Sequence, residues 1–338
     1  MTKESAAKNA PKAAASRERK GVRSEKTRVE GMIVPLVTPL AEDYAVDVPA
    51  LRSLCEIQIE AGTDVFFALG TTGEYYGLAS DQRREVVETI VETVAGRVPI
   101  LIGVCGDSTV ASLKALDDYR HVRAAGYVAS APYFMDYSQE ELLDHFRAIA
   151  EAAGQPIVLY NLPARYRHCL EPDTVGQLLS EKCVVGIKDS SGDKLYLRQM
   201  LDLKRPFPSF RVFEGALPSL PETCRWGIDG SVMAFANLLP GEFAGFWQSV
   251  RAVDWTQAEK RVSRLVDFFQ EVQSLGREVA VLKACMALKG WCRPTLVQPG
   301  VPLGDETTAR LRAALNSVCV EPVGNRASSR KQKGGSTG

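Results

Sequence analysis

Residues 184–189 read Val-Val-Gly-Ile-Lys-Asp, and residues 156–161 read Pro-Ile-Val-Leu-Tyr-Asn. Each stretch is short, rich in β-branched side chains and nearly continuous in apolar residues until a polar residue near its end. This pattern is typical of strands that are buried on both faces, as parallel strands are. Both stretches are therefore predicted to be strands of a parallel sheet.

Further stretches of the same kind recur along the chain, and helical patterns separate them. The predicted strands are residues 32–37, 65–70, 99–104, 127–132, 156–161, 184–189, 211–215 and 230–237. One helical pattern covers 138–153, where a Ser-x-x-Glu start precedes apolar residues at three- and four-residue steps. Eight such units predict an α/β protein, a (β/α)8 TIM barrel of about 250 residues. An open doubly wound sheet is the alternative, but the chain has no GxGxxG or Walker sequence.

Beyond about residue 253 the strand patterns stop, and helical patterns cover 257–275, 279–290 and 305–318. The barrel is therefore expected to carry a C-terminal helical segment, an element that often serves assembly or packing. The predicted division of the chain is a basic tail at 1–30, the barrel with the active site at 31–252, the helical segment at 253–322 and a second basic tail at 323–338.

The formal net charge of zero hides an uneven distribution of charge. Residues 1–30 carry nine Lys or Arg against four acidic residues, and residues 323–338 carry four against none, which leaves −9 for residues 31–322. Both ends have almost no large apolar side chains, so they are predicted to be disordered. Solvation is the first interpretation of their charge, and contact with nucleic acid or another polyanion is the alternative.

Composition also argues against several classes of protein. No apolar run reaches the length of about eighteen residues that a membrane span needs, and no apolar segment of a secretory signal follows the N-terminal charges. The eight cysteines include no CxxC pair, which indicates thiols in a reducing compartment and predicts a cytoplasmic location. The three histidines form no HxH or HExxH pair, so a zinc site or another metal site built from histidines is not expected.

Candidate catalytic residues fall at the ends of predicted strands, where barrel enzymes carry out their chemistry. Gly-Thr-Thr-Gly-Glu at 70–74 would form a cradle for a carboxylate, or an ordinary glycine-rich turn. Tyr160 ends the fifth strand, where it would serve either catalysis or packing. Lys188 shares one face of its strand with Gly186, and burial there would favour a neutral, nucleophilic amine. A surface lysine, or an ion pair with Asp189, is the alternative.

Together these residues resemble the dihydrodipicolinate synthase / N-acetylneuraminate lyase family. The resemblance runs in order from about residue 31 to 320, through the motifs GTTGE (70–74), YNLPAR (160–165), GIKDSSGD (186–193), FEG (213–215) and the segment 230–237. It implies a (β/α)8 class I aldolase that needs no metal or cofactor and assembles as a homotetramer, a dimer of dimers. Its substrates would be pyruvate, or another small 2-oxo acid, and an aldehyde.

The resemblance also implies a role for individual residues. Lys188 matches the lysine that forms a Schiff base with the 2-oxo acid, and Tyr160 matches the tyrosine that transfers protons to and from it. Thr72 matches the residue that holds the substrate carboxylate, and Thr71 the one that relays a proton with Tyr160. Arg165 matches the arginine that holds the second substrate's carboxylate in the synthase. Two further positions match backbone that lines the pocket, Gly215 and Val232.

Several positions depart from the synthase pattern. The synthase relay uses a second tyrosine, contributed across a dimer interface, and the matching residue here is Phe134. Either the neighbouring Tyr133 takes its place, or the relay is built differently and the enzyme is not a true dihydrodipicolinate synthase. Bulky phenols also stand where the synthase has small residues, at Tyr75, Tyr76 and Tyr166. They would suit a hydroxylated acceptor such as a sugar-acid aldehyde, or they would be packing residues.

The sequence thus predicts a pyruvate-dependent Schiff-base aldolase or lyase, similar to dihydrodipicolinate synthase. The alternative within the class is a sugar-acid lyase acting on 2-keto-3-deoxygluconate, N-acetylneuraminate or 4-hydroxy-2-oxoglutarate. A non-catalytic barrel that binds a metabolite is the alternative of another class.

Overall fold

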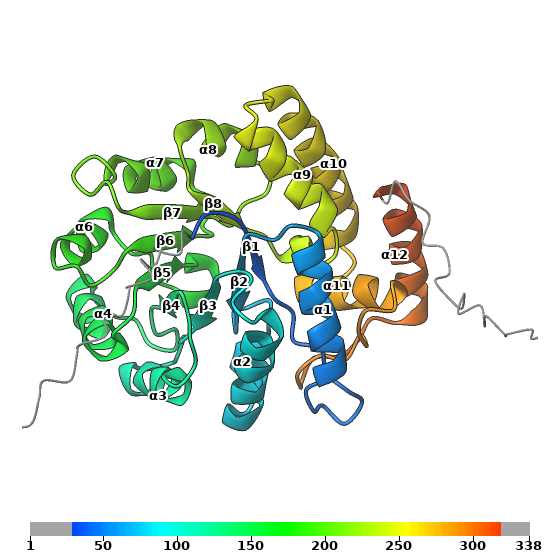
Figure 1. Cartoon of the computed structure of the whole chain (residues 1–338), viewed down its shortest axis with the longest axis horizontal. Coiled ribbons are helices and arrows are strands. Elements are labelled where there is room, and N and C mark those ends of the chain that lie inside the picture. The colour runs from blue at the N-terminus through cyan, green and yellow to red at the C-terminus, as the bar shows by residue number, and fades with distance from the viewer. Residues whose placement is uncertain (1–28, 319–338) are drawn as a thin grey trace, which may run out of the picture.

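Eight parallel strands form a closed ring in the computed structural model, which describes residues 29–318 (Figure 1). Each strand pairs with the next in chain order, and the last pairs with the first through Ile33 and Val232. Every strand residue is buried except Arg211, which is half-buried. The strands are β1 Gly31–Pro35, β2 Val65–Ala68, β3 Ile100–Gly103, β4 Gly126–Ser130, β5 Ile157–Asn161, β6 Gly186–Asp189, β7 Arg211–Glu214 and β8 Gly230–Val232. The prediction of a (β/α)8 barrel is confirmed.

Helices surround this ring and cover its outer face (Figure 1). Their bounds are α1 Val48–Glu60, α2 Ser80–Val94, α3 Thr109–Tyr119, α4 Gln139–Ala153, α5 Pro163–Tyr166, α6 Pro172–Ser180, α7 Lys194–Asp202, α8 Leu220–Trp226 and α9 Pro240–Arg251. The predicted start of α4 is confirmed, because Ser138 and Glu141 cap each other's backbone N–H groups. The same helix ends at Gly154, whose φ of 59° suits glycine.

The predicted strand at 230–237 is too long. β8 ends at Val232, and Ala234–Asn237 form a 3-10 helix, η2. The cause is the buried side chain of Asn237, which donates to the carbonyl oxygens of Pro35 and Ala234 and accepts from the backbone N–H of Val37. These bonds turn the chain inward after β8 and fix the end of β1.

Three helices follow the barrel: α10 Trp255–Gln273, α11 Glu278–Leu288 and α12 Asp305–Val318. Their bounds agree with the predicted helical patterns to within two residues. α10 packs against α9 and α12, and α11 contacts η2. The predicted tails at 1–30 and 323–338 lie outside the described residues, apart from Val29 and Glu30. Within the described range, no helix combines the length and the apolar character that a membrane crossing requires.

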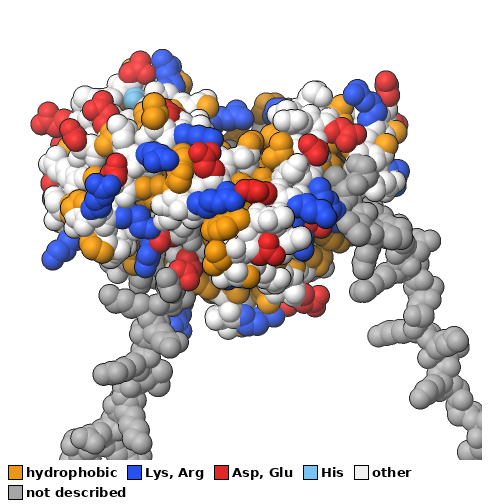
Figure 2. Space-filling view, turned by 90° about the horizontal axis from the view of Figure 1, so that it is seen from above, with side chains coloured by type: hydrophobic (Ala, Val, Ile, Leu, Met, Phe, Trp, Pro, Cys, Tyr) orange, Lys and Arg blue, Asp and Glu red, His pale blue; other side chains and the backbone are white. Residues whose placement is uncertain are grey.

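Charges of both signs are interspersed over the face of the molecule in Figure 2. The interior is different, because residues 280–286 of α11 are all buried and one of them is Lys283. Its ammonium lies 2.5 Å from the carboxylate of Glu74, and neither side chain is more than 2% exposed. Lys283 also donates to the carbonyl oxygen of Thr295, and Glu74 accepts from the backbone N–H of Val297. This buried ion pair connects the loop after β2 to the C-terminal helices.

Lys283→Met removes the ammonium and leaves the Glu74 carboxylate buried without its ionic partner. We expect the free energy of unfolding to fall by about 3–5 kcal/mol, as when one member of a buried ion pair is removed. Urea denaturation of the variant and the wild type measures the loss. Lys260→Met, at an exposed position of α10, is the matched control and should change stability by about 0.5 kcal/mol or less. A loss no larger than that of the control would contradict the prediction.

Candidate active site

A cavity of about 700 Å³ opens at the carboxyl ends of the strands. Its lining comes from the carboxyl ends of β1, β5, β6 and β8, from the loops that follow β2, β4, β5, β6, β7 and β8, and from the start of α11 and the segment that follows this helix. All the site residues predicted from the sequence line this one cavity: Thr71, Thr72, Tyr133, Tyr160, Arg165, Lys188, Gly215 and Val232. Because strands in a barrel all point the same way, residues far apart in the sequence meet at one mouth.

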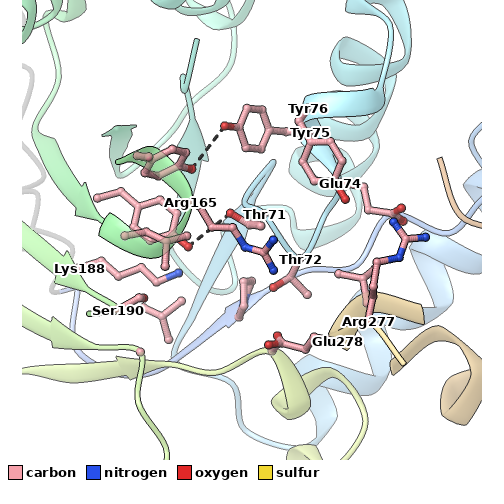
Figure 3. Close-up of a pocket in the computed structure, with 18 of the residues that line it drawn as sticks. Thr71, Thr72, Glu74, Tyr75, Tyr76, Arg165, Lys188, Ser190, Arg277 and Glu278 are labelled. Carbon is pink, nitrogen blue, oxygen red and sulfur yellow. Dashed lines mark hydrogen bonds between the residues drawn. The ribbon is translucent and has the colours of Figure 1, made fainter. Parts of the chain in front are cut away.

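Lys188 lies on β6 directly beside Tyr160 of β5. Its side chain is 7% exposed, and its Nζ lies 4.0 Å from the centre of the Tyr160 ring and 5.5 Å from that of Phe67. No carboxylate of the described residues comes within ion-pair distance of this amine. Asp189, the alternative partner, instead accepts from the side chains of Asn161 and Ser191 at 2.8 Å each. The structure thus presents an inward-facing amine against aromatic rings (Figure 3).

The turn after β2 places two threonine hydroxyls at the cavity. Gly73 and Glu74 donate their backbone N–H groups to the carbonyl oxygens of Gly70 and Thr71, and this closes a tight turn. Thr38 holds this turn in place, because its hydroxyl donates to the Gly73 carbonyl oxygen at 2.8 Å. A Cβ on Gly73 would lie 2.8 Å from the backbone oxygen of Leu36, so only glycine fits there. The turn is therefore held by its own backbone hydrogen bonds, by the Thr38 hydroxyl and by the close approach of the Leu36 carbonyl oxygen.

Hydroxyl groups approach one another on the same side of the cavity. The Thr71 hydroxyl lies 3.4 Å from that of Tyr160, and the Tyr75 hydroxyl lies 3.4 Å from that of Tyr166. Tyr166 is 5% exposed, and burial raises the pKa of its phenol well above the ordinary value. Figure 3 shows both contacts as dashed lines. The phenols at 75 and 166 are therefore part of a hydrogen-bonded cluster.

The side chains of Tyr133 and Phe134, the two candidates for the position of the second relay tyrosine, point in different directions. Tyr133 lines the cavity with its ring 6.1 Å from that of Tyr166. Phe134 is 75% exposed and does not line the cavity. Within its own chain, therefore, Tyr133 and not residue 134 faces the site.

Arg165 reaches the cavity from α5, the short helix that begins at Pro163 directly after β5. Gly215 also lines the cavity, and a Cβ on it would lie 2.2 Å from the Ser190 hydroxyl oxygen. Glycine at 215 therefore allows the loops after β6 and β7 to approach closely. Val232, at the end of β8, adds an apolar contact to the lining.

The start of α11 also lines the mouth, and sequence reasoning missed it. Arg277, Glu278, Val279 and Ala280 all contribute, although this segment was interpreted only as an assembly or packing element. The Glu278 side chain is exposed to solvent at the open mouth. Partial burial still raises the pKa of its carboxyl, whereas the positive charges of Lys188 and Arg165 act to lower it. The sequence signal that could have indicated this part of the lining is the charged pair Arg277-Glu278 at the start of an otherwise apolar helical pattern.

The profile of the dihydrodipicolinate synthetase family matches residues 28–318. The chain belongs to this family. The family predicted from the sequence is therefore confirmed, and with it the class of enzyme, a carbon–carbon lyase that works as a pyruvate-dependent Schiff-base aldolase.

Individual family members resemble this chain over most of its length. A 4-hydroxy-tetrahydrodipicolinate synthase of Pelobacter propionicus is 33% identical, over 85% of this chain and 98% of its own. An uncharacterized DapA-like lyase of Pyrococcus abyssi is 31% identical, over 86% and 98%. Among solved structures, the prophage protein YagE of E. coli K12, in complex with pyruvate, has a TM-score of 0.82 at 28% identity, over 86% of this chain and 98% of its own.

Gly73→Ala tests whether backbone contacts fix the threonine turn. The new Cβ would meet the Leu36 carbonyl oxygen at 2.8 Å, so the turn must shift. We expect a stability loss of about 1–3 kcal/mol, typical of overpacking, together with weaker binding of pyruvate. Gly241→Ala on α9 is the matched control, because nothing lies within 4 Å of its Cβ. Urea denaturation and pyruvate titration check both variants, and equal behaviour would contradict a fixed turn.

Proposed function

We propose that the chain makes or breaks a carbon–carbon bond next to the carbonyl of pyruvate or another small 2-oxo acid, through an imine on Lys188. The observation that carries this proposal is the buried amine of Lys188, which faces the cavity beside Tyr160 without an ion pair among the described residues. An amine in such an apolar setting is a nucleophile toward carbonyl carbon once it is neutral.

The remaining residues of the cavity would assist in a defined order. Thr72 would hold the carboxylate of the 2-oxo acid, while the Lys188 amine adds to C2. Tyr160 would pass a proton from nitrogen to the carbonyl oxygen and then protonate the hydroxyl that leaves as water. The resulting iminium withdraws electrons, so C3 can lose a proton to become an enamine, or the bond between C3 and C4 can break. Thr71 lies 3.4 Å from Tyr160 and would support these proton transfers.

The acceptor side of the cavity carries charged and phenolic groups. Arg165 would bind a carboxylate of the second substrate, while Gly215, Val232 and Tyr133 would line the space around it. Tyr76, Arg277 and Glu278 line the outer mouth. These groups offer hydrogen-bond partners to a hydroxylated aldehyde, which favours a sugar-acid lyase as the second candidate beside a dihydrodipicolinate synthase.

Pyruvate and borohydride together should reduce and trap the imine on one lysine. We expect a stable mass on the tryptic segment that contains Lys188, with cleavage after Lys188 lost and the nearby exposed Lys194 unmodified. Mass spectrometry of the folded enzyme measures it. Lys188→Arg and a sample without pyruvate are the controls. A folded wild type that stays unlabelled would exclude the imine mechanism and leave the non-catalytic barrel.

A substrate panel should separate the two candidates. The lyase candidate requires release of pyruvate from 2-keto-3-deoxygluconate, N-acetylneuraminate or 4-hydroxy-2-oxoglutarate, which a coupled lactate dehydrogenase assay detects. The synthase candidate requires condensation of pyruvate with aspartate semialdehyde. Because Phe134 has no hydroxyl and the mouth is rich in phenols, we expect the higher kcat/KM with a compound of the first group. Condensation faster than every cleavage would exclude the lyase candidate.

The assembly and location of the enzyme also remain proposals. The resemblance implies a homotetramer, a dimer of dimers, and the cysteine pattern indicates the cytoplasm. Sedimentation analysis of the full chain would test the tetramer. The predicted division of the chain at residues 30, 252 and 322 is also a proposal, and limited proteolysis would test it.

A further inference from the structure

Three charged side chains line the cavity without a charged partner. Arg165 belongs to α5, Arg277 is the N-cap residue of α11, and Glu278 is the first residue of that helix. Within residues 29–318, none of the three takes part in an ion pair or a side-chain hydrogen bond. In Figure 3 they surround the part of the cavity where Thr72 lies. Their charges are therefore available to a ligand.

Arg277 stands at a place where its charge does not serve the helix. The N-terminus of a helix carries a partial positive charge, so a cation there is unfavourable. N-cap positions favour Ser, Thr, Asp or Asn, whose side chains accept a hydrogen bond from the backbone, and the Arg277 side chain makes no such bond. Residues that break a local rule of stability are expected at functional sites. A ligand therefore explains Arg277 better than the helix does.

The helix that carries these two residues is anchored to the rest of the site. Residues 280–286 of α11 are all buried, and the ion pair between Lys283 and Glu74 joins the helix to the residue directly after the threonine turn. The Arg277 guanidinium lies close to Gly300, because a Cβ added there would stand 3.0 Å from one of its nitrogens. The start of α11 therefore keeps its position relative to Thr72, which belongs to that turn.

The charges at the mouth indicate the chemistry of the ligand. Arg165 and Arg277 are positive and Glu278 is negative, so together they carry a single positive charge when Glu278 is ionised. One carboxylate balances this charge, and guanidinium groups bind carboxylates through paired hydrogen bonds. The Glu278 carboxylate can only accept hydrogen bonds, so it needs donors such as hydroxyl groups, and it repels further negative charge. The matching ligand is a singly charged, hydroxylated acid.

We propose that Arg277 and Glu278 determine the second substrate of this enzyme, a hydroxylated aldehyde with a carboxylate at its far end. This inference rests on the proposed function. Arg277, together with Arg165, would bind the far carboxylate, and Glu278 would accept hydrogen bonds from the hydroxyl groups between that carboxylate and the reacting carbon. In the direction of cleavage, the substrate is then a 2-oxo acid with a carboxylate at each end, and Thr72 would hold the other one.

Three compounds that differ only at C6 test this assignment. 2-Keto-3-deoxygluconate has a hydroxyl group there, and its two analogues have a carboxylate and a phosphate ester. Cleavage of the bond between C3 and C4 releases pyruvate from each of them, which a coupled lactate dehydrogenase assay measures. We expect the wild-type kcat/KM to be about tenfold or more higher for the carboxylate compound than for the other two, because its charge-assisted hydrogen bonds are strong. The absence of this preference would overturn the proposal.

Arg277→Met keeps an unbranched side chain and removes the charge. We expect the KM for the carboxylate compound to rise by about tenfold with kcat unchanged, because the lost contact is far from the reacting bond. The KM for 2-keto-3-deoxygluconate should stay within about twofold. Arg312→Met, at an exposed position of α12 outside the cavity, is the matched control and should change neither value. An equal rise for both compounds would mean a disturbed cavity and would overturn the role of Arg277.

Glu278→Gln keeps the shape of the side chain and removes its negative charge. The carboxylate and phosphate compounds have the same hydroxyl groups, so the ratio of their kcat/KM values reports the effect of charge. We expect this ratio to fall severalfold, because the doubly charged phosphate is repelled more strongly in the wild type. Glu271→Gln, at an exposed position of α10, is the matched control. A ratio equal to that of the wild type would contradict the selection by Glu278.

Failure of this inference is distinguishable from failure of the proposed function. Pyruvate and borohydride should label Lys188 to the same extent in the wild type, Arg277→Met and Glu278→Gln, because neither substitution removes a contact to pyruvate. If Lys188 is labelled but the carboxylate compound is not preferred, or none of the three compounds is cleaved, only the inference about the second substrate is wrong. If the wild type is not labelled, the proposed function itself fails.

Discussion

Hydrogen bonds between β1 and β8 close the sheet, and every other feature of the site depends on this closure. A closed parallel sheet has no free edge, and all its strands end at the same mouth. Lys188, Tyr160 and the threonine turn come from three different strands and still face one cavity. Asn237 strengthens the closure, because its side chain binds backbone atoms at the end of β1, 200 residues away in the chain.

The cavity at the carboxyl ends of the strands is open, and the C-terminal helical segment after the barrel adds residues to its mouth. α11 is almost entirely apolar and buried, but its N-cap residue Arg277 and its first residue Glu278 lie at the cavity. The ion pair between Lys283 and Glu74 joins this helix to the residue directly after the threonine turn. This interaction therefore links the position of the threonine turn to that of the C-terminal helices.

The fold and the core of the site could be predicted from the sequence, because their signals are local. Buried parallel strands are continuous apolar runs, and the alternation along 184–189 puts Lys188 on one face with Gly186, while the family resemblance gave this lysine its role. The end of β8 was missed, because the bonds of Asn237 that turn the chain there join residues distant in sequence. Tyr166 was recognised as unusual, but its hydroxyl partner Tyr75 is 91 residues away, and only the folded chain brings them together.

The contact between Glu74 and the C-terminal helices has a consequence for the nascent chain. Glu74 accepts a hydrogen bond from the backbone N–H of Val297, which lies 223 residues later in the chain. The ribosome must therefore synthesise the barrel and α11 before the Glu74 carboxylate can meet Lys283 and Val297. Until then, the loop after β2 carries an unpaired charge that favours contact with water over burial. A truncated translation product that ends before α11 would thus form neither a finished core nor a competent catalyst.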